Sequence, residues 1–194
     1  PKIFIHDTNK SHFQLLLVIY WVSYNTISKS FVTNNNFLRS KYNLLMTIHP
    51  NPGPKGSVIL HLHTYNVNGL GEGEKAKRIV NKFLAPERQA KGAKIVIGLQ
   101  ETHLTNSTVP QFDTKWRNEA VHSTHTSNSA GVAILYFAHH WEEKLDTFSD
   151  DNGRFCSVTL KGCDDNLYSF LNVSVPNIGV EGQALPFIEE LDLH

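Results

Sequence analysis

This chain has few cysteines and no formal net charge. It has two cysteines, Cys156 and Cys163, and its 18 basic side chains equal its 18 acidic ones. Two cysteines are too few for the disulfide framework of a small secreted domain, so Cys156, which lies in a strand pattern, is interpreted as a buried free thiol. The balanced charge excludes the overall basic field by which many nucleic-acid-binding proteins are recognised.

Long hydrophobic runs are also scarce. Residues 13–22, FQLLLVIYWV, are apolar, but a membrane-spanning helix needs roughly 20 such residues, and no membrane association is expected. The run is compatible with the apolar part of a signal peptide, with a short packed helix or with a strand. The preceding Asp7 and the lack of a small-residue cleavage site after the run argue against the signal peptide.

The first 56 residues are expected to form an N-terminal extension that ends in a proline-rich linker. Three prolines alternate along HPNPGPKG, residues 49–56, and this spacing excludes a helix. With 40% hydrophobic residues the chain can bury a sizeable core, and we expect residues 57–194 to form the packed domain.

A strand, a helix and a second strand open this packed region. Residues 58–65 predict a strand, and residues 93–99 predict a strand that is buried on both faces. Between them, residues 74–84 carry apolar side chains on one side and basic ones on the other, which predicts an amphipathic helix ended by Pro86. The fold class is therefore α/β.

The remainder alternates between expected loops and expected strands. Residues 102–129 are interpreted as a loop anchored by Trp116, with His122 and His125 as exposed loop residues. Strands are predicted over residues 130–137, 154–160 and 167–174, followed by a helix within residues 181–194.

Polar side chains collect where the predicted strands end. They are Asn66, Asn68, Gln100, Glu101, Asn172 and Asn177. Carboxylate and amide oxygens suit Mg²⁺ or Mn²⁺, and amide nitrogens can hold a phosphate oxygen. Glu101 follows a buried strand and is the candidate metal ligand, with a solvated loop carboxylate as the alternative. The set is compatible with half of a phosphodiester-cleaving site.

One stretch departs from the balanced charge. Residues 74–94 contain seven basic and two acidic side chains. The excess is compatible with a solvated helix face or with a phosphate-binding patch, for which Lys75, Lys77 and Arg78 are the candidate nucleic-acid-binding residues.

Five short motifs occur in an order that resembles one superfamily. They are NVNGL (residues 66–70), LQETHL (99–104), SAGVAIL (129–135), GRFCSV (153–158) and NVSVPN (172–177). Their order and rough spacing resemble the endonuclease/exonuclease/phosphatase superfamily, which has the DNase I-like fold. The closest resemblance is to the apurinic-type endonuclease domain of non-LTR (LINE-type) retrotransposons, and it covers residues 57–194.

The resemblance implies a fold and a reaction. The fold would be a four-layered α/β sandwich, here an incomplete N-terminal half with one sheet and its helix largely represented and the second sheet missing. The reaction would be Mg²⁺- or Mn²⁺-dependent hydrolysis of a DNA phosphodiester. DNA would be the partner, with the remainder of a retrotransposon polyprotein and its reverse transcriptase as a further one. The location would be nuclear, or otherwise intracellular.

The resemblance also assigns roles to individual residues. Glu101 would bind the metal, and Asn66 would lie at the metal and the scissile phosphate. Asn68 stands where repair relatives often have a metal-binding aspartate, and His103 would belong to the rim of the active site. Asn177 would contact phosphate.

Two departures from the family pattern predict weak or no activity. Ser174 stands where the family has a tyrosine, and losing one transition-state hydrogen bond typically costs on the order of 10²–10³ in rate. Neither the family's GDFN motif nor its final Ser-Asp-His occurs in residues 1–194. The alternatives are a non-catalytic retroelement remnant, a nucleic-acid-binding module, or a lipid or inositol phosphate phosphodiesterase of the same superfamily.

Overall fold

The computed structural model describes the backbone of residues 5–7, 14–21, 42–48, 58–70, 73–89 and 92–174, and the side chains of residues 59–70, 73–84 and 92–174. Its strands are β1 (Ile5–Asp7), β2 (Gln14–Trp21), β3 (Tyr42–Ile48), β4 (Val58–Asn66), β5 (Lys94–Gln100), β6 (Glu119–Ser123), β7 (Val132–Tyr136), β8 (Glu143–Ser149), β9 (Phe155–Lys161) and β10 (Leu167–Ser174). Its helices are α1 (Glu74–Gln89), α2 (Val109–Trp116) and the short 3₁₀ helix η1 (Ala138–His140). The expected linker, Asn177 and the expected C-terminal helix lie outside these residues.

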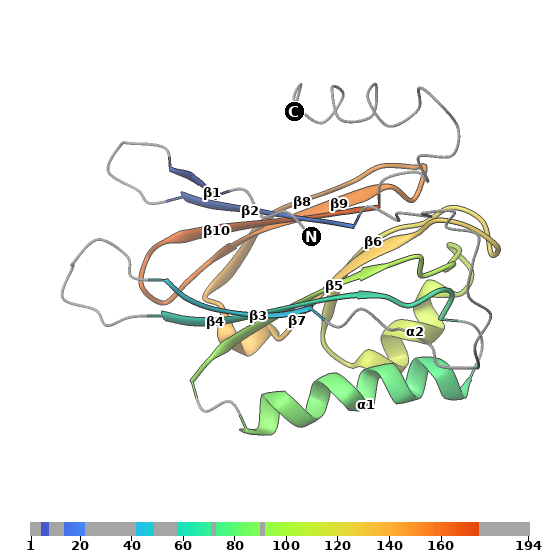
Figure 1. Ribbon diagram of the computed structural model, residues 1–194, viewed down its shortest axis with the longest axis horizontal. Helices are drawn as coiled ribbons and strands as arrows, with labels where there is room; N and C mark the ends of the chain where they lie inside the picture. The colour runs from blue at the N-terminus through green and yellow to red at the C-terminus, as the bar shows by residue number, and fades with distance from the viewer. Residues whose placement is uncertain are drawn as a thin grey trace, which may run out of the picture.

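Two five-stranded sheets lie face to face, and α1 and α2 cover the outer face of one of them (Figure 1). The helix-covered sheet has the order β3-β4-β5-β7-β6, and the second sheet has the order β1-β2-β10-β9-β8. The α/β class is confirmed. The expectation that one sheet would be missing is wrong, because the apolar rows of β9 and β10 face the helix-covered sheet across a shared core.

Two of the three strands in the expected N-terminal extension pair with strands that follow it, and the third, β1, pairs with β2. β2 runs parallel to β10 over its whole length, and β3 runs antiparallel to β4. Of the three interpretations of residues 13–22, the structure has the strand. The domain boundary at residue 57 stays a prediction, but strand pairing crosses it in both sheets.

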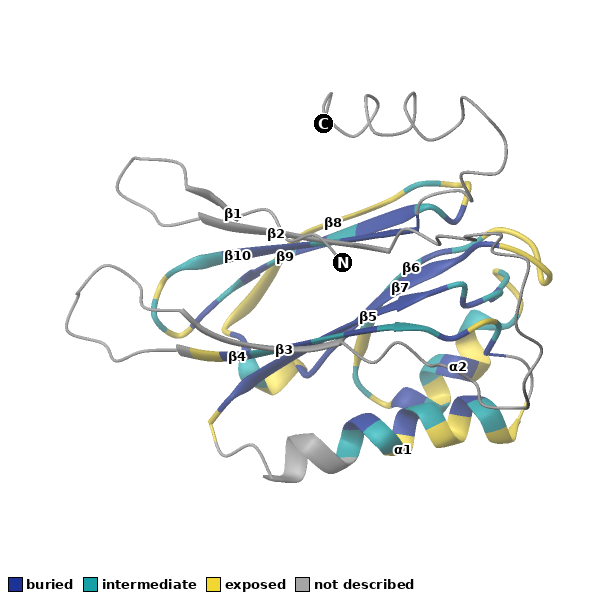
Figure 2. Ribbon diagram, in the orientation of Figure 1, coloured by how far each residue is buried: buried dark blue, intermediate teal, exposed yellow. Residues whose placement is uncertain are grey.

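Alternation of side chains along the strands divides the core into two layers (Figure 2). Along β5, Val96 faces the second sheet, whereas Ile95 and Ile97 face the helices. All seven residues of β5 are buried, as the continuous apolar run predicts. β5 pairs in parallel with β4 and antiparallel with β7, so the helix-covered sheet is mixed. Cys156 is a buried free thiol, as predicted, and burial raises its pKa.

Helix α1 packs on this sheet through its predicted apolar face. Val80 and Phe83 are buried in the layer between the helices and the sheet. The helix nevertheless continues past Pro86 to Gln89, so the prediction that Pro86 ends it is wrong. A proline removes one backbone hydrogen bond and bends a helix, but its fixed φ angle remains compatible with helical geometry.

The expected loop over residues 102–129 contains regular structure, so this prediction is also wrong. Helix α2 buries Phe112 and Trp116, one helical turn apart, and β6 forms the edge of the helix-covered sheet. His122 is therefore not an exposed loop residue. It lies in β6, its side chain is 9% exposed, and its Nε2 lies 2.8 Å from Asp113 Oδ1 of α2. His125 is exposed, as predicted.

A buried amide joins the two sheets. Asn172 of β10 is 0% exposed, and its Nδ2 donates to the carbonyl oxygens of Leu99 and Ala133, both at 2.9 Å. Its Oδ1 accepts a hydrogen bond of 2.5 Å from Gln100 Nε2. A Cβ atom added at Gly98 would lie 3.0 Å from Asn172 Oδ1, so β10 approaches β5 closely at this glycine and a side chain there would crowd the amide.

Among the described residues, no helix is both long and apolar enough to cross a membrane.

Replacing Asn172→Asp tests this connection. The substitution removes both donors and places a carboxylate against two carbonyl oxygens, so we expect a loss of about 3–5 kcal/mol in the free energy of unfolding at neutral pH. The site raises the pKa of that carboxyl above its value in the unfolded chain, so the loss should shrink as the pH falls. Urea unfolding at neutral and acidic pH measures both effects.

Asn106→Asp is the matched control, because Asn106 is exposed and its Oδ1 only accepts a hydrogen bond, from Thr124 Oγ1 at 2.7 Å. We expect it to change stability by less than about 0.5 kcal/mol. Equal losses in the two variants would contradict the structural role of Asn172.

Candidate functional site

The loops that carry the sequence motifs meet at one edge of the two sheets. The segment that follows β4 is hydrogen-bonded through its backbone to the end of β5 and the residue after it. The amide of Val67 donates to the Gln100 carbonyl at 2.9 Å, and the amide of Gly69 donates to the Glu101 carbonyl at 2.6 Å. The first two motifs are therefore held side by side by backbone hydrogen bonds.

The other three motifs join the same edge. Thr102 N–H donates to the Gly131 carbonyl at 2.9 Å, and Gly131 N–H donates to the Gly153 carbonyl, also at 2.9 Å. Ser174 N–H donates to the Arg154 carbonyl at 2.7 Å. The bond between Gly131 and Gly153 passes from one sheet to the other. We call this convergence of residues 66–70, 101–103, 130–131, 153–154 and 174 the motif edge.

Left-handed backbone is concentrated at the motif edge. Six non-glycine residues of the described chain have a positive φ, and four of them lie here: Asn68 (46°), Glu101 (52°), His103 (54°) and Ala130 (57°). This conformation costs an L-residue roughly 1–2 kcal/mol, and such strain is typically retained at functional sites. The surrounding backbone hydrogen bonds hold Glu101 and His103 in it.

Glu101 and Asn66 supply the oxygen atoms of the candidate metal site. Asn66 pairs with Gln100 in the parallel ladder, so it lies beside the start of the Glu101 loop. Both side chains are partly exposed, and Asn66 Oδ1 accepts a hydrogen bond of 3.0 Å from the Asn68 amide. Within the described chain, no three His, Cys, Asp or Glu side chains are grouped to hold a metal. One carboxylate with amide oxygens fits Mg²⁺, which keeps several waters.

Two amides of the polar set belong to the core instead. Gln100 and Asn172 are both 0% exposed, and they bond to each other. Gln100 Nε2 also donates to Thr64 Oγ1 at 3.0 Å. Their hydrogen bonds are made within the protein, so the interpretation of these two residues as metal or phosphate ligands is wrong.

His103 and Ser174 lie at the motif edge with different exposure. The His103 ring covers Gly69, since a Cβ atom added there would lie 2.8 Å from His103 Nδ1. His103 also lines a hollow of about 410 Å³ between the two helices and the loops after β4 and β5. Ser174 is 5% exposed at the end of β10. Asn177 lies beyond the described residues.

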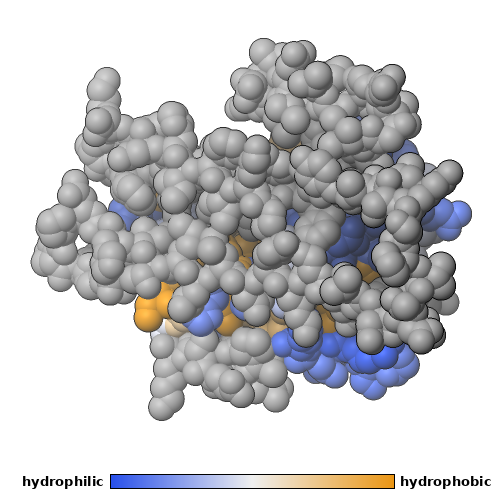
Figure 3. Space-filling view, in the orientation of Figure 1, coloured by the Kyte–Doolittle hydropathy of each residue, from blue (hydrophilic) through white to orange (hydrophobic). Residues whose placement is uncertain are grey.

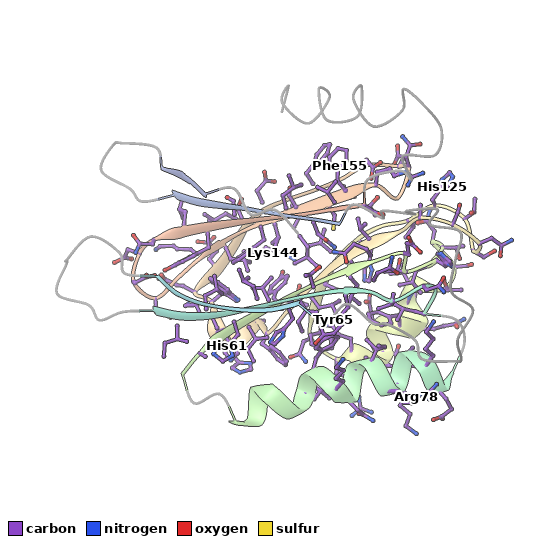
Figure 4. All side chains as sticks on the ribbon, in the orientation of Figure 1. His61, Tyr65, Arg78, His125, Lys144 and Phe155 are labelled. Carbon is purple, nitrogen blue, oxygen red and sulfur yellow. The ribbon has the colours of Figure 1, made fainter. Side chains whose placement is uncertain are left out.

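The predicted basic side chains lie on α1. Lys75 Nζ donates to the Asn68 carbonyl at 2.7 Å, which connects α1 to the motif edge. Lys77 and Arg78 are exposed, and Arg78 points away from the sheets (Figure 4). A hydrophilic surface covers this part of α1 (Figure 3). Lys94 is not part of it, because the residue is buried and its Nζ donates to the His140 carbonyl. Burial lowers the pKa of Lys94.

Sequence reasoning missed the residues that α2 contributes to the hollow. Thr108, Gln111 and Lys115 line it, but their segment was expected to be a loop. Two signals favour a helix there. Pro110 lies at the start, where proline is tolerated, and Phe112 and Trp116 are four residues apart.

Models of known protein families give no match to this chain, and no curated protein matches it. Its function is therefore inferred from the motifs and from the geometry of the motif edge.

The left-handed backbone at Glu101 can be tested by substitution. Glycine adopts this conformation without steric cost, whereas a β-branched residue is strongly disfavoured there. We expect Glu101→Gly to change the free energy of unfolding by less than about 1 kcal/mol, because relief of strain offsets the entropy that glycine loses on folding.

Glu101→Val should destabilise the chain by at least about 1 kcal/mol more than Glu101→Gly. Chemical denaturation of the two variants beside the parent chain measures the difference. Equal stability of the glycine and valine variants would mean that residue 101 is not left-handed.

Proposed function

We propose that this chain belongs to a divalent-metal-dependent phosphodiesterase that nicks DNA, and that it is of retrotransposon origin. The observation that supports the proposal best is the motif edge. Five motifs spread over more than a hundred residues meet there through backbone hydrogen bonds, with Glu101 and His103 in strained conformations. Core packing alone does not require strained polar residues at the exposed end of a sheet.

Each residue has a defined task in this proposal. Glu101 holds Mg²⁺ or Mn²⁺, with Asn66 and Asn68 as neighbouring oxygen donors. The bound ion would neutralise charge on the phosphate and orient an attacking water. His103 borders the phosphate-binding side, and Lys75, Lys77 and Arg78 attract the DNA backbone. Asn177 is the further proposed phosphate contact.

The finer fold assignment is part of the same proposal. Helices, a sheet and a second sheet make three layers in the described residues, and we propose that the complete domain is the four-layered DNase I-like sandwich. Chromosomal DNA as the substrate would place the protein in the nucleus. A lipid or inositol phosphate substrate is less compatible with the exposed basic face of α1, which suits an extended polyanion.

Nicking of supercoiled plasmid by the 194-residue chain tests the catalytic proposal. We expect weak cleavage that requires Mg²⁺. Ser174 stands where the resembled family has a tyrosine, and the loss of general acid–base help lowers a rate by about 10²–10⁴. Glu101→Gln should abolish this cleavage while leaving stability unchanged.

Glu142→Gln is the control, since Glu142 is an exposed carboxylate that pairs with Lys161 at the other end of β9. Cleavage that survives Glu101→Gln, or that persists in EDTA, would refute the role of Glu101.

A nucleic-acid-binding module without catalysis is the second candidate function. The observation that favours it is that no three His, Cys, Asp or Glu side chains are grouped to hold a metal in the described part of the chain. Lys77 and Arg78 would then bind phosphates with no need for a metal. Lys77 Nζ lies 3.8 Å from Glu74 Oε1, and this exposed pair contributes little energy.

Charge reversal of Lys75, Lys77 and Arg78 to Glu tests this face. We expect the triple variant to bind duplex DNA at least tenfold more weakly in EDTA, with a reduced dependence of affinity on salt. Fluorescence anisotropy over a range of salt concentrations measures both quantities. Unchanged affinity would exclude α1 from the interface under either function.

A further inference from the structure

The described residues that line the hollow between α1 and α2 include no acidic side chain. Its polar lining comes from Asn68, Lys75, His103, Thr108, Gln111, Lys115 and Ser127. Two lysines, one histidine and neutral hydrogen-bonding groups therefore face a space of about 410 Å³. The net charge of this lining is positive at neutral pH, so it favours an anion.

Two other hollows in the described chain have a different character. One of about 690 Å³ includes Asp150 and Asp151 in its lining, and one of about 240 Å³ includes Glu119, Glu142 and Glu143. Each of these also contains Lys144, which pairs with Glu119 at 3.2 Å. The lysine of these two hollows is paired with a carboxylate, whereas no ion pair of Lys115 is found among the described residues.

Helix α2 is fixed so that Lys115 faces this hollow. Phe112 and Trp116 hold the helix in the core, and Thr108 Oγ1 accepts the amide of Thr105 at 2.8 Å before its first turn. The acidic residue of α2, Asp113, is engaged with His122 on another side of the helix. Lys115 forms no ion pair within the described residues, and its Nζ lies 3.5 Å from the Gln111 carbonyl of its own helix. Its charge is therefore available to a ligand.

The hollow is continuous with the motif edge. Lys75 is bonded to the Asn68 carbonyl, and Gly69 N–H donates to the Glu101 carbonyl. His103, two residues after Glu101, covers Gly69 and lines the hollow. The hollow and the motif edge therefore share Asn68, Gly69 and His103, and a polyanion bound at the motif edge would lie beside the hollow.

We propose that the α1–α2 hollow is a second phosphate-binding subsite, in which Lys115, Lys75 and Gln111 bind a backbone phosphate adjacent to the one at Glu101. This subsite rests on the proposed nucleic-acid substrate and extends it to α2. The ligand chemistry is a phosphate group, which either a DNA strand or a free phosphorylated molecule can supply.

The test measures binding of a DNA duplex in EDTA, where no cleavage occurs. We expect Lys115→Gln to weaken binding about threefold to tenfold and to lower the slope of log affinity against log salt by about one, the value for one lost phosphate contact. Lys161→Gln is the matched control, because Lys161 lies at the far end of β9 and pairs with Glu142 and Asp165. It should leave the slope unchanged.

A set of duplexes, each with one neutral methylphosphonate, locates the contact. In the parent chain, the methylphosphonate that replaces the phosphate bound by Lys115 should weaken binding. In Lys115→Gln, the same methylphosphonate should cause no further loss of affinity. A Lys115→Gln variant with the slope and position profile of the parent chain would overturn the subsite, as would equal effects of Lys115→Gln and Lys161→Gln.

Failure of the nucleic-acid proposal gives a separate result. If the parent chain binds no DNA, inorganic phosphate is titrated and the amide signals of Gln111 and Lys115 are followed by NMR. Shifts that disappear in Lys115→Gln would support a subsite for a free phosphorylated ligand while the nuclease proposal fails. No shift at these amides would overturn the subsite as well.

Discussion

The buried amide of Asn172 is the interaction on which the rest of the described structure depends. Its two donors bond to carbonyl oxygens of β5 and β7, and its acceptor is satisfied by Gln100. An amide with every partner inside the protein fixes both the distance and the register between two sheets, because a shift in either direction leaves buried polar groups unpaired. The apolar side chains around it contribute energy but tolerate sliding.

This fixed register places the motif edge. β10 ends at Ser174 and β9 begins near Arg154, so the bond between these residues forms only when β10 is correctly seated. The bond from Gly131 to Gly153 then joins the edge of one sheet to the edge of the other. Strain at Glu101 persists because these backbone bonds oppose its release. The polar side chains are thus positioned by the core and not by contacts with one another.

The sequence predicted the elements whose side chains are buried on one face or on both faces. β5, β7 and β10 read directly as apolar or alternating runs, and α1 as an amphipathic helix. It could not predict β8, whose seven residues are all exposed, or the short α2, whose polar residues resemble a loop. The sequence grouped Gln100 and Asn172 with the polar residues at the strand ends, because an amide at a strand end has the same sequence pattern whether it faces solvent or another sheet. Only the packing of the two sheets separates them from Asn66 and Glu101.

A single carboxylate also constrains how the proposed site would work. Mg²⁺ gives up its water reluctantly, so Glu101 with neighbouring amide oxygens would hold it weakly unless substrate phosphate oxygens supplied further ligands. Metal binding and substrate binding would then be coupled, each raising the affinity for the other by the same factor. Lys75 and Lys115, which line the hollow, would strengthen the substrate side of this coupling under the proposed function. Retention of the phosphate by the helices would therefore compensate for the low charge of the metal site at Glu101.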